Sequence, residues 1–258
     1  MEQHIFKKKY GQNFLNDSNI LEKIYKSINP NEDDLIIEIG PGSGNLTKWL
    51  QKFNANIVCY EIDTSLKERL NLIKNDKTTF LFKDFLETNI LEDIKDIKYK
   101  NIYFVANIPY YITTPIIEKI ALSNLNPISL TLMMQKEVGE RLSAKPKSKD
   151  YGYITVFLNY FYDIKILFNV NRNCFFPKPN VDSVVVQFLS KPKNNTDFNK
   201  FNNLIKNAFK FKRKNLRNNL KGYDLNKIEA ILKEDGYSLL DRAESIPLET
   251  YIKITDNL

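Results

Sequence analysis

The chain has 258 residues, of which 43% are hydrophobic and 12% aromatic, so it is long enough to bury one large core with a small appendage. Its formal net charge of +7 and its pI near 9.1 indicate a polyanionic partner. The single histidine, His4, excludes a Ser-His-Asp triad, a histidine proton shuttle and a histidine-rich metal site. Cys59 and Cys174 lack metal-ligand spacing and are interpreted as buried reduced thiols, so no metal site is expected.

The N-terminal segment is basic and polar. Lys7, Lys8 and Lys9 are followed by the polar stretch 11–13 rather than by the apolar core of a signal peptide. No apolar stretch approaches the roughly 20 residues that span a bilayer, so we expect no membrane partner and a cytoplasmic location. A helix is predicted over Ser18–Ser27, with Asp17 or Ser18 as its N-cap.

An apolar strand, Leu35–Ile39, runs directly into the glycine-rich turn Gly40-Pro41-Gly42-Ser43-Gly44 and then into an amphipathic helix. This order is typical of a nucleotide-cofactor loop, because glycines let the backbone approach a ligand and the start of a helix presents free N–H groups. A dinucleotide fingerprint has its third glycine where this chain has Asn45, which weakens a pyrophosphate interpretation. The next apolar run, Ile57–Tyr60, ends in Glu61, the acidic residue that such sites direct at ribose hydroxyls.

Two further strand ends carry polar side chains. Asp84 follows the run Thr79–Phe82, and Asn107 follows the run Ile102–Ala106. Because the carboxyl ends of parallel strands meet at one edge of a sheet, these side chains are expected to converge with Glu61. Taken singly, Glu61 or Asp84 is better explained as a solvated side chain or a helix cap.

The stretch Asn107-Ile108-Pro109-Tyr110 suits a grip on the exocyclic amine of a base. The lone pair of adenine N6 is delocalised into the ring, and an asparagine oxygen with a nearby backbone carbonyl can free it by accepting the two N6 hydrogens. Pro109 would hold the loop with its carbonyls aimed into a cleft, and Tyr110 offers a π-face to an unstacked base. By itself the four-residue match favours an ordinary strand-ending turn with a buried tyrosine.

The order of the elements predicts an α/β fold. Five apolar runs alternate with helical patterns between Leu35 and Gln135, which is typical of a parallel sheet with helices on both faces. Further on, Tyr153–Tyr162 is predicted as a helix, and Ile164–Val170 with Val184–Phe188 as a closing antiparallel strand pair.

The polar, proline-containing stretch 191–196 predicts the domain boundary. We expect one domain over residues 1–190 and a small, all-α, basic RNA-binding domain over 191–258. The basic stretch Lys145–Lys149 is interpreted as a surface loop, with RNA contact as the alternative.

A cluster of cations lies in the second predicted domain, in what is expected to be a short helical window. Interleaved apolar residues, Phe209, Phe211, Leu216 and Leu220, predict that one face packs while the other binds an RNA backbone, although a solvated basic helix face is the alternative. The cations are Lys206, Lys210, Lys212, Arg213, Lys214, Arg217 and Lys221.

Ordered motifs run through nearly the whole chain. They are Lys9-Tyr10-Gly11-Gln12-Asn13-Phe14-Leu15, Glu38-Ile39-Gly40-Pro41-Gly42, Glu61-Ile62-Asp63, Asp84, Asn107-Ile108-Pro109-Tyr110, Gln135-Lys136-Glu137-Val138, the stretch from Phe175 to Ser183, and Arg213-Lys214-Asn215-Leu216-Arg217-Asn218-Asn219-Leu220. Together these motifs resemble the ribosomal RNA adenine N6-dimethyltransferases, and specifically the small-subunit (16S) branch that dimethylates two adjacent adenines.

The resemblance implies a Rossmann-like class I methyltransferase sheet and S-adenosylmethionine as cofactor. Glu61 would hold the ribose and Asp84 the adenine amine. The cofactor contacts that it implies are Asn13, Leu15, Gly40, Gly42, Glu61, Asp84 and Asn107.

The resemblance also implies where the target adenine is held. Its catalytic residues would be Asn107, Ile108, Pro109, Tyr110 and Phe175, where Phe175 supplies a second aromatic face and Phe176 is the adjacent alternative. The partner would be ribosomal RNA within an immature small ribosomal subunit, bound by a monomer during ribosome biogenesis.

The chain departs from the small-subunit pattern at Ile108, where that branch often has leucine, and at Tyr111, where many members have asparagine. Because Ile108 also occurs in the large-subunit resistance enzymes, this motif alone does not assign the branch. The stretches 175–183 and 135–141 and the basic C-terminal segment resemble the small-subunit branch.

The expected reaction is in-line displacement at the cofactor's methyl group by adenine N6, in which orientation supplies most of the acceleration. Three alternatives remain. A large-subunit (23S) adenine dimethyltransferase has the same chemistry, and a non-catalytic RNA-binding assembly factor keeps only the basic surface. A nicotinamide dehydrogenase is disfavoured by Asn45 and by the lack of a histidine for proton transfer.

Overall fold

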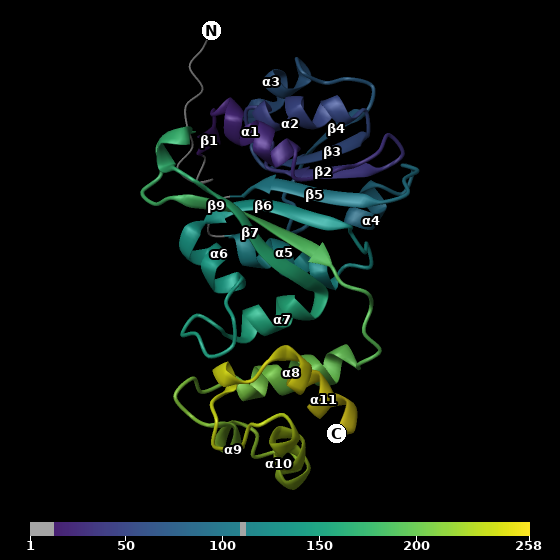
Figure 1. The fold of residues 1–258 in the computed structure, drawn as a ribbon. Helices are drawn as coiled ribbons and strands as arrows, with labels where there is room; N and C mark the ends of the chain where they lie inside the picture. Colours follow the sequence, from purple (N-terminus) through teal and green to yellow (C-terminus); the bar gives the residue numbers. More distant parts are fainter. Residues whose placement is uncertain (1–12, 109–111) are drawn as a thin grey trace. The chain divides into compact units, whose positions relative to one another are not determined.

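The computed structural model describes residues 13–108 and 112–258 (Figure 1). The chain divides into two compact units. The first contains the described residues up to Gly139 together with Lys165–Ser190, and the second contains Glu140–Ile164 and Lys191–Leu258.

A seven-stranded sheet forms the centre of the first unit, in the order β4-β3-β2-β5-β6-β9-β7. The first five of these pair in parallel, which confirms the predicted parallel sheet; β9 joins β6 antiparallel and has β7 as its other neighbour. The strands are β2 (Leu35–Ile39), β3 (Asn56–Glu61), β4 (Thr78–Phe82), β5 (Ile102–Asn107), β6 (Ser129–Gln135), β7 (Tyr162–Val170) and β9 (Ser183–Ser190).

Helices cover both faces of this sheet. Figure 1 shows α1, α2 and α3 on one face and α4 and α5 on the other, while α6 follows β6. Asp17 caps α1 by accepting hydrogen bonds from the backbone N–H groups of Asn19 and Ile20, as predicted. The helices are α1 (Ser18–Tyr25), α2 (Asn45–Leu50), α3 (Lys67–Asn71), α4 (Ile90–Asp93), α5 (Thr113–Leu122) and α6 (Lys136–Leu142).

The central strands are apolar on both sides because both faces of the sheet are covered. Leu35, Ile36 and Ile37 of β2 are fully buried, and Phe104 and Val105 of the neighbouring β5 are equally inaccessible. These buried strands hold the carboxyl ends of β2, β3 and β5 in fixed positions. The polar residues of the site lie at these ends.

A second, two-stranded sheet joins segments far apart in the sequence. Strand β1 (Phe14–Leu15) pairs antiparallel with β8 (Phe175–Phe176), so that Leu15 lies opposite Phe175. The backbone N–H of Asn16 extends the pairing by donating to the Cys174 carbonyl at 3.0 Å. Leu15 and Phe175 are both buried and belong to the core cluster that includes α1.

The second unit is mainly helical. Rings of α7 pack on α8, where Tyr160 stacks on Phe201 with the centroids 4.7 Å apart and Phe157 meets Phe198 edge-on. Its helices are α7 (Tyr153–Phe161), α8 (Phe198–Ala208), α9 (Leu216–Asn219), α10 (Leu225–Glu234) and α11 (Leu248–Asn257).

The compact units differ from the domains 1–190 and 191–258 predicted from the sequence. Residues 140–164 group with the C-terminal helices, because aromatic rings of α7 pack on α8. In the described parts of the chain, every helix is too short or too polar to traverse a lipid bilayer.

The helical window predicted for the basic cluster is wrong in its middle part. Helix α8 ends at Ala208 and α9 begins at Leu216, and turns occupy residues 209–215 between them. Leu216 and Leu220 are fully buried as predicted, but Phe211 is 55% exposed. The alternation of aromatic and basic residues there does not mark one packed helical face.

Candidate functional site

A cavity of about 180 Å³ opens at the carboxyl ends of β2, β3, β4 and β5, the edge that open parallel sheets use for ligands. It is lined by Asn13, Phe14, Leu15, Leu21, Glu38, Ile39, Gly40, Pro41, Gly42, Ser43, Asn45, Leu46, Tyr60, Glu61, Ile62, Lys83, Asp84, Phe85, Leu86, Asn107, Ile108, Ile112 and Ile116.

The turn after β2 needs glycine for two separate reasons. Gly42 has a φ of +56°, in the left-handed region that favours glycine, and a Cβ placed on it would lie 2.7 Å from Cε1 of Phe14. Gly44 has a φ of +79°, and its Cβ would lie 2.2 Å from Cδ1 of Ile73. The turn is therefore shaped to let the N-terminal segment on one side and α3 on the other approach the backbone closely.

Glu61 is held at the end of β3 by two backbone donors. The N–H of Gly42 donates to its Oε2 at 3.0 Å, and the N–H of Asp63 donates to its Oε1 at 2.8 Å. Burial raises the pKa of this carboxyl, and backbone hydrogen bonds from Asp63, Gly42 and Ile62 oppose that rise. The carboxylate is thereby fixed against the glycine turn with acceptor capacity remaining on both oxygens.

Glu38 lies behind the turn and forms a buried polar cluster. Its Oε2 accepts hydrogen bonds from Oγ1 of Thr47 at 2.6 Å and from Sγ of Cys59 at 3.5 Å. The pKa of Glu38 is raised to about 7: complete burial raises it most, the Thr47 and Cys59 hydrogen bonds oppose that rise, and repulsion from Glu61 adds to it. Glu38 thus links the first turn of α2 to β2 and β3 below the cavity.

The loop that carries Asp84 is held from both sides. Within the loop, the backbone N–H of Leu86 donates to Oδ1 of Asp84 at 2.8 Å. From α5, Nζ of Lys119 donates to the carbonyl oxygens of Leu86 at 2.8 Å and Thr88 at 2.6 Å. The ammonium therefore fixes two carbonyls of the segment that positions the Asp84 carboxylate.

Two asparagines tie the N-terminal segment to the rim of the cavity. Nδ2 of Asn107 donates to the Asn13 carbonyl at 3.3 Å. Nδ2 of Asn45 donates to the Leu15 carbonyl and to Oδ1 of Asn16, both at 2.9 Å. Asn45, which stands where a dinucleotide fingerprint has glycine, therefore has a structural role: it anchors the N-terminal segment beside the cavity.

The structure brings together most of the residues predicted from the sequence. All of the predicted cofactor contacts, which are Asn13, Leu15, Gly40, Gly42, Glu61, Asp84 and Asn107, line the cavity, as does Ile108.

Three residues predicted as catalytic stand apart from this set. Pro109 and Tyr110 lie outside the described residues. Phe175 is only 5% exposed and belongs to the core cluster rather than to the cavity lining, whereas the neighbouring Phe176 is 61% exposed. The antiparallel pairing of β8 with β1 turns these two successive side chains to opposite sides.

Sequence reasoning missed Glu38, Asn45 as an anchor, Lys119 and the apolar lining at Phe85. Two signals were available, because a carboxylate in an otherwise apolar strand and apolar neighbours beside Asp84 are both unusual for solvated positions. Lys119 gave no signal, since its role depends on where α5 lies beside the Asp84 loop.

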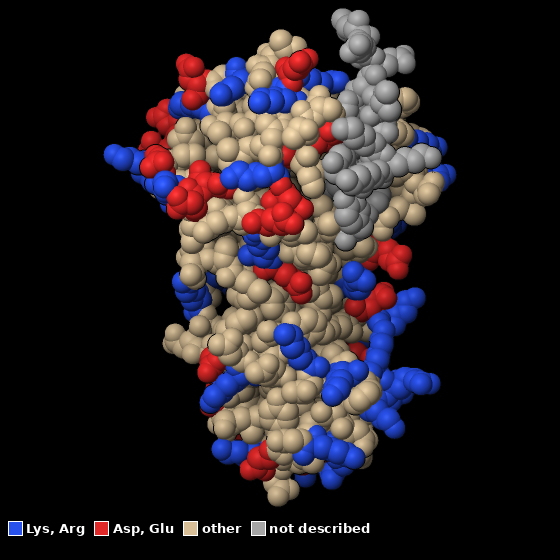
Figure 2. Space-filling model, turned by 180° about the vertical axis from the view of Figure 1, so that it is seen from behind, with Lys and Arg blue, Asp and Glu red and all other residues tan. Residues whose placement is uncertain are grey.

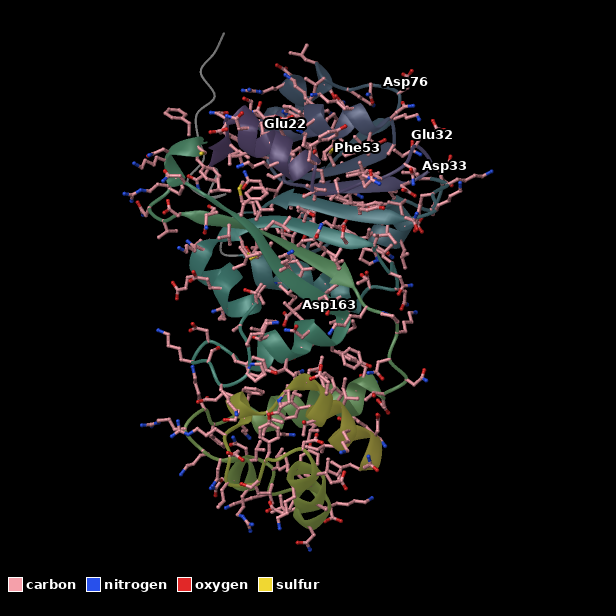
Figure 3. All side chains as sticks on the ribbon, viewed as in Figure 1. Glu22, Glu32, Asp33, Phe53, Asp76 and Asp163 are labelled. Carbon is pink, nitrogen blue, oxygen red and sulfur yellow. The ribbon has the colours of Figure 1, made fainter. Side chains whose placement is uncertain are left out.

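Acidic side chains also lie at the end of the sheet opposite the cavity. Figure 3 shows the acidic side chains of Glu32, Asp33 and Asp76 at the edge where the strands begin, away from the glycine turn. Asp33 forms an ion pair with Lys100 there at 2.6 Å. Among the residues that the structure describes, no cluster of three or more His, Cys, Asp or Glu side chains is arranged to hold a metal ion.

Comparison with known proteins identifies the family. The family model for ribosomal RNA adenine dimethylase matches residues 3–258. The "Ribosomal RNA small subunit methyltransferase A" of Mycoplasma mobile is 43% identical over 254 residues, covering 96% of each chain. The protein of the same name from Clostridium acetobutylicum is 38% identical over 266 residues, covering 98% of this chain and 94% of the relative.

Solved structures agree with this assignment. A dimethyladenosine transferase from Plasmodium falciparum superposes with a TM-score of 0.77 at 26% identity, covering 93% of this chain and 95% of that one. The 23S rRNA methyltransferase ErmE, at 23% identity and a TM-score of 0.76, shares the fold, covering 95% of this chain and 99% of that one. The methyltransferase fold predicted from the sequence is confirmed, and the chain belongs to the ribosomal RNA adenine dimethylase family.

Proposed function

We propose that this chain transfers methyl groups from S-adenosylmethionine to N6 of two adjacent adenosines in small-subunit ribosomal RNA, giving N6,N6-dimethyladenosine. The observation that carries the proposal is the convergence of Gly40, Glu61, Asp84 and Asn107 on one cavity in a member of the adenine dimethylase family. The relatives named as small-subunit methyltransferases favour the small-subunit target.

The residues of the cavity fit S-adenosylmethionine. Glu61 keeps acceptor capacity on both carboxylate oxygens after binding Gly42 and Asp63, which suits a pair of ribose hydroxyls. Asp84, fixed by Leu86 on Oδ1, would accept from the adenine amine. The missing Cβ at Gly42 leaves room for the Phe14 ring, which lines the same cavity.

Asn107 is oriented for the target base by its own hydrogen bond. Because Nδ2 donates to the Asn13 carbonyl, Oδ1 is the atom left to accept a hydrogen from adenine N6. Accepting that hydrogen pulls N6 toward tetrahedral geometry and frees its lone pair for attack. After one transfer N6 keeps a single hydrogen, so one acceptor can still align it for a second.

The cofactor would supply a methyl group made electrophilic by its sulfonium charge, and the protein supplies position. Ile108 is buried in the cavity wall directly before Pro109 in the sequence. The assignment of Tyr110 as an aromatic face for the base rests on the sequence resemblance.

The second aromatic face is better assigned to Phe176 than to Phe175. The Phe175 ring is packed in the core beside Leu15, and only the Phe176 ring offers a large exposed surface to a base. Phe175 would then hold β8 in place. Phe176, which the sequence analysis gave as the alternative, would be the second aromatic face for the base.

Further parts of the proposal rest on the sequence resemblance. They are an immature small ribosomal subunit as substrate, a monomeric protein, a cytoplasmic location, and the assignment of residues 1–190 to catalysis and 191–258 to RNA binding. A large-subunit target remains the second candidate, because ErmE shares the fold. The intact Glu61, Asp84 and Asn107 argue against a non-catalytic assembly factor.

The test is transfer of labelled methyl from S-adenosylmethionine to immature small ribosomal subunits and, in parallel, to large-subunit RNA, with mass mapping of the modified nucleotides. Dimethyladenosine at a small-subunit site supports the proposal. Label only in large-subunit RNA would move the chain to the other branch, and no label in either would leave the assembly-factor alternative. A binding assay with S-adenosylmethionine and NAD tests the dehydrogenase alternative, because a methyltransferase is expected to bind only S-adenosylmethionine.

A further inference from the structure

We infer that Asp93, the last residue of α4, is a positioning residue for the adenine end of the cofactor. Its carboxylate holds the loop of residues 83–88, called the adenine loop, in the conformation in which Asp84 accepts from the adenine amine. The inference rests on the proposed function, because it takes S-adenosylmethionine as the cofactor and Asp84 as the acceptor of its amine.

The Asp93 carboxylate accepts hydrogen bonds from the adenine loop and from β3. Nζ of Lys83 donates to Oδ1 and forms an ion pair with it. Oγ1 of Thr88 donates to Oδ2 at 2.8 Å, and the hydroxyl of Tyr60 donates to the same oxygen at 3.2 Å. Because Lys83 and Thr88 are the two ends of the loop and Tyr60 belongs to β3, one carboxylate ties both loop ends to the sheet.

The residues that Asp93 holds belong to the cavity, although Asp93 itself does not. Tyr60 and Lys83 line the cavity, and each directly precedes an acid that is assigned to the cofactor. Asp93 and Thr88 are not among the described residues of the lining. A change at Asp93 or Thr88 therefore affects a bound cofactor only through the residues that they position.

The middle of the adenine loop is fixed by packing on the same tyrosine. Phe85 is buried and lines the cavity, and its ring meets the ring of Tyr60 edge-on with the centroids 5.2 Å apart. The hydroxyl of that tyrosine is the group that Asp93 binds. Asp84 lies between Lys83 and Phe85 in the sequence, so both of its neighbours are held by contacts that depend on Asp93.

A cation from α5 holds the loop from a second helix. Nζ of Lys119 donates to the carbonyl oxygens of Leu86 and Thr88. Burial lowers the pKa of this ammonium, and the charges of Asp84 and Asp93 oppose that fall. The adenine loop is therefore held by an anion from α4 and by a cation from α5.

An ordinary surface ion pair is the alternative explanation for Lys83 and Asp93. Figure 2 shows acidic and basic side chains intermixed over the first unit, and exposed pairs of this kind contribute little to stability. Asp93 differs because its side chain is only 13% exposed and accepts three hydrogen bonds. Its removal leaves the Tyr60 and Thr88 hydroxyls without their acceptor, a cost that favours rearrangement of the loop.

The experiment compares two ligands that differ at one position of the base. S-adenosylhomocysteine has the exocyclic amine, whereas S-inosylhomocysteine has a carbonyl oxygen in its place and cannot donate from there to Asp84. Calorimetry of the full-length protein with each ligand gives the ratio of the two affinities, which is called the amine preference. The wild type is expected to prefer the amine ligand by roughly 10- to 100-fold, as is typical of a hydrogen bond to a charged acceptor.

D93A is expected to lower the amine preference by about tenfold. The affinity for S-adenosylhomocysteine should fall by about that factor and the affinity for S-inosylhomocysteine by no more than about twofold, because only the first ligand uses the Asp84 carboxylate. A protein that merely loses stability would not discriminate between the two ligands in this way.

Two milder variants and one control accompany D93A. T88V removes one donor and D93N removes the charge that pairs with Lys83, and both are expected to lower the amine preference by roughly two- to fivefold. D96A removes an exposed carboxylate three residues further along the chain and is expected to leave the preference unchanged. Thermal unfolding checks that each variant is folded, and T88V and D93N decide the question if D93A is not.

An amine preference that stays at the wild-type value in folded D93A, or in both T88V and D93N, would overturn the inference. So would an equal loss of preference in D96A. In these cases the wild type still prefers the amine ligand, so the proposed function stands. A wild type that binds neither ligand, or both equally, would instead overturn the assigned cofactor contacts and the inference with them.

Discussion

Replacing Glu38 by glutamine is expected to make the first unit more resistant to unfolding at alkaline pH than the wild type. The reason is that the carboxyl is completely buried, which raises its pKa from an ordinary 4.5 to about 7. The folded state therefore prefers the protonated form. Its contribution to stability is complete below pH 4.5, falls as the pH rises toward 7, and is lost above that value.

The magnitude follows from the pKa difference. A difference of about 2.5 between the folded and unfolded pKa values corresponds to about 3 kcal/mol, of which about 2 to 3 kcal/mol falls between pH 5 and pH 8. In E38Q the side chain stays neutral throughout, and its amide oxygen can still accept the hydrogen bond from Thr47. The stability of the wild type relative to E38Q should therefore fall by that amount over this pH range.

Urea unfolding at pH 5, 6, 7 and 8 measures the difference. Trp49 is the only tryptophan of the chain and lies in α2, so its fluorescence reports the unit that contains Glu38. E87Q, which changes an exposed glutamate near Asp84, is the control for the chemical substitution. A stability difference between wild type and E38Q that stays constant from pH 5 to pH 8 would refute the reasoning, because Glu38 would then not change its ionisation in the folded state.

Three other substitutions test the site and its surroundings. N107A is expected to lower methyl transfer by roughly 10²- to 10³-fold while changing S-adenosylmethionine affinity far less, and equal losses in the two assays would count against the assigned role. K119M frees the Leu86 and Thr88 carbonyls and should lower stability by about 1 to 3 kcal/mol in urea unfolding and weaken cofactor binding in calorimetry, with RNA binding unchanged as the control. Charge removal at Arg213, Lys214 and Arg217 should weaken RNA binding and lower its salt slope by about 0.7 to 0.9 for each phosphate no longer neutralised, and an unchanged slope would dismiss a role for these cations in RNA binding.

The sequence predicted the parts of the site that depend on local order. The parallel strands, the glycine turn and the acids at the strand ends follow from periodicity and spacing, because each element ends where its apolar run ends. Parallel pairing then brings Glu61, Asp84 and Asn107 to one edge without further information.

The parts that the sequence did not predict depend on long-range packing. Only the pairing of β1 with β8 shows that Phe175 points into the core and Phe176 outward. The helical assignment of residues 209–215 was wrong because Nδ2 of Asn219 binds the Ala208 and Phe211 carbonyls and Asn215 starts a new helix as the N-cap of α9, which periodicity cannot reveal. Likewise, residues 140–164 join the second unit because α7 buries its aromatic face on α8.

The pairing of β1 with β8 also constrains the order in which the chain can assemble. Asn13 and Leu15 form part of the cavity wall, yet the strand that holds them pairs with residues about 160 positions later, at Phe175 and Phe176. During synthesis, the parallel strands can form before that point, and Asn45 and Asn107 can bind the segment, but its strand pairing is missing until Phe176 has left the ribosome. A nascent chain that stops at β6 therefore has the glycine turn, Glu61 and Asp84, but a cavity wall without its strand partner, so we expect tight binding of the cofactor only once the first unit is complete.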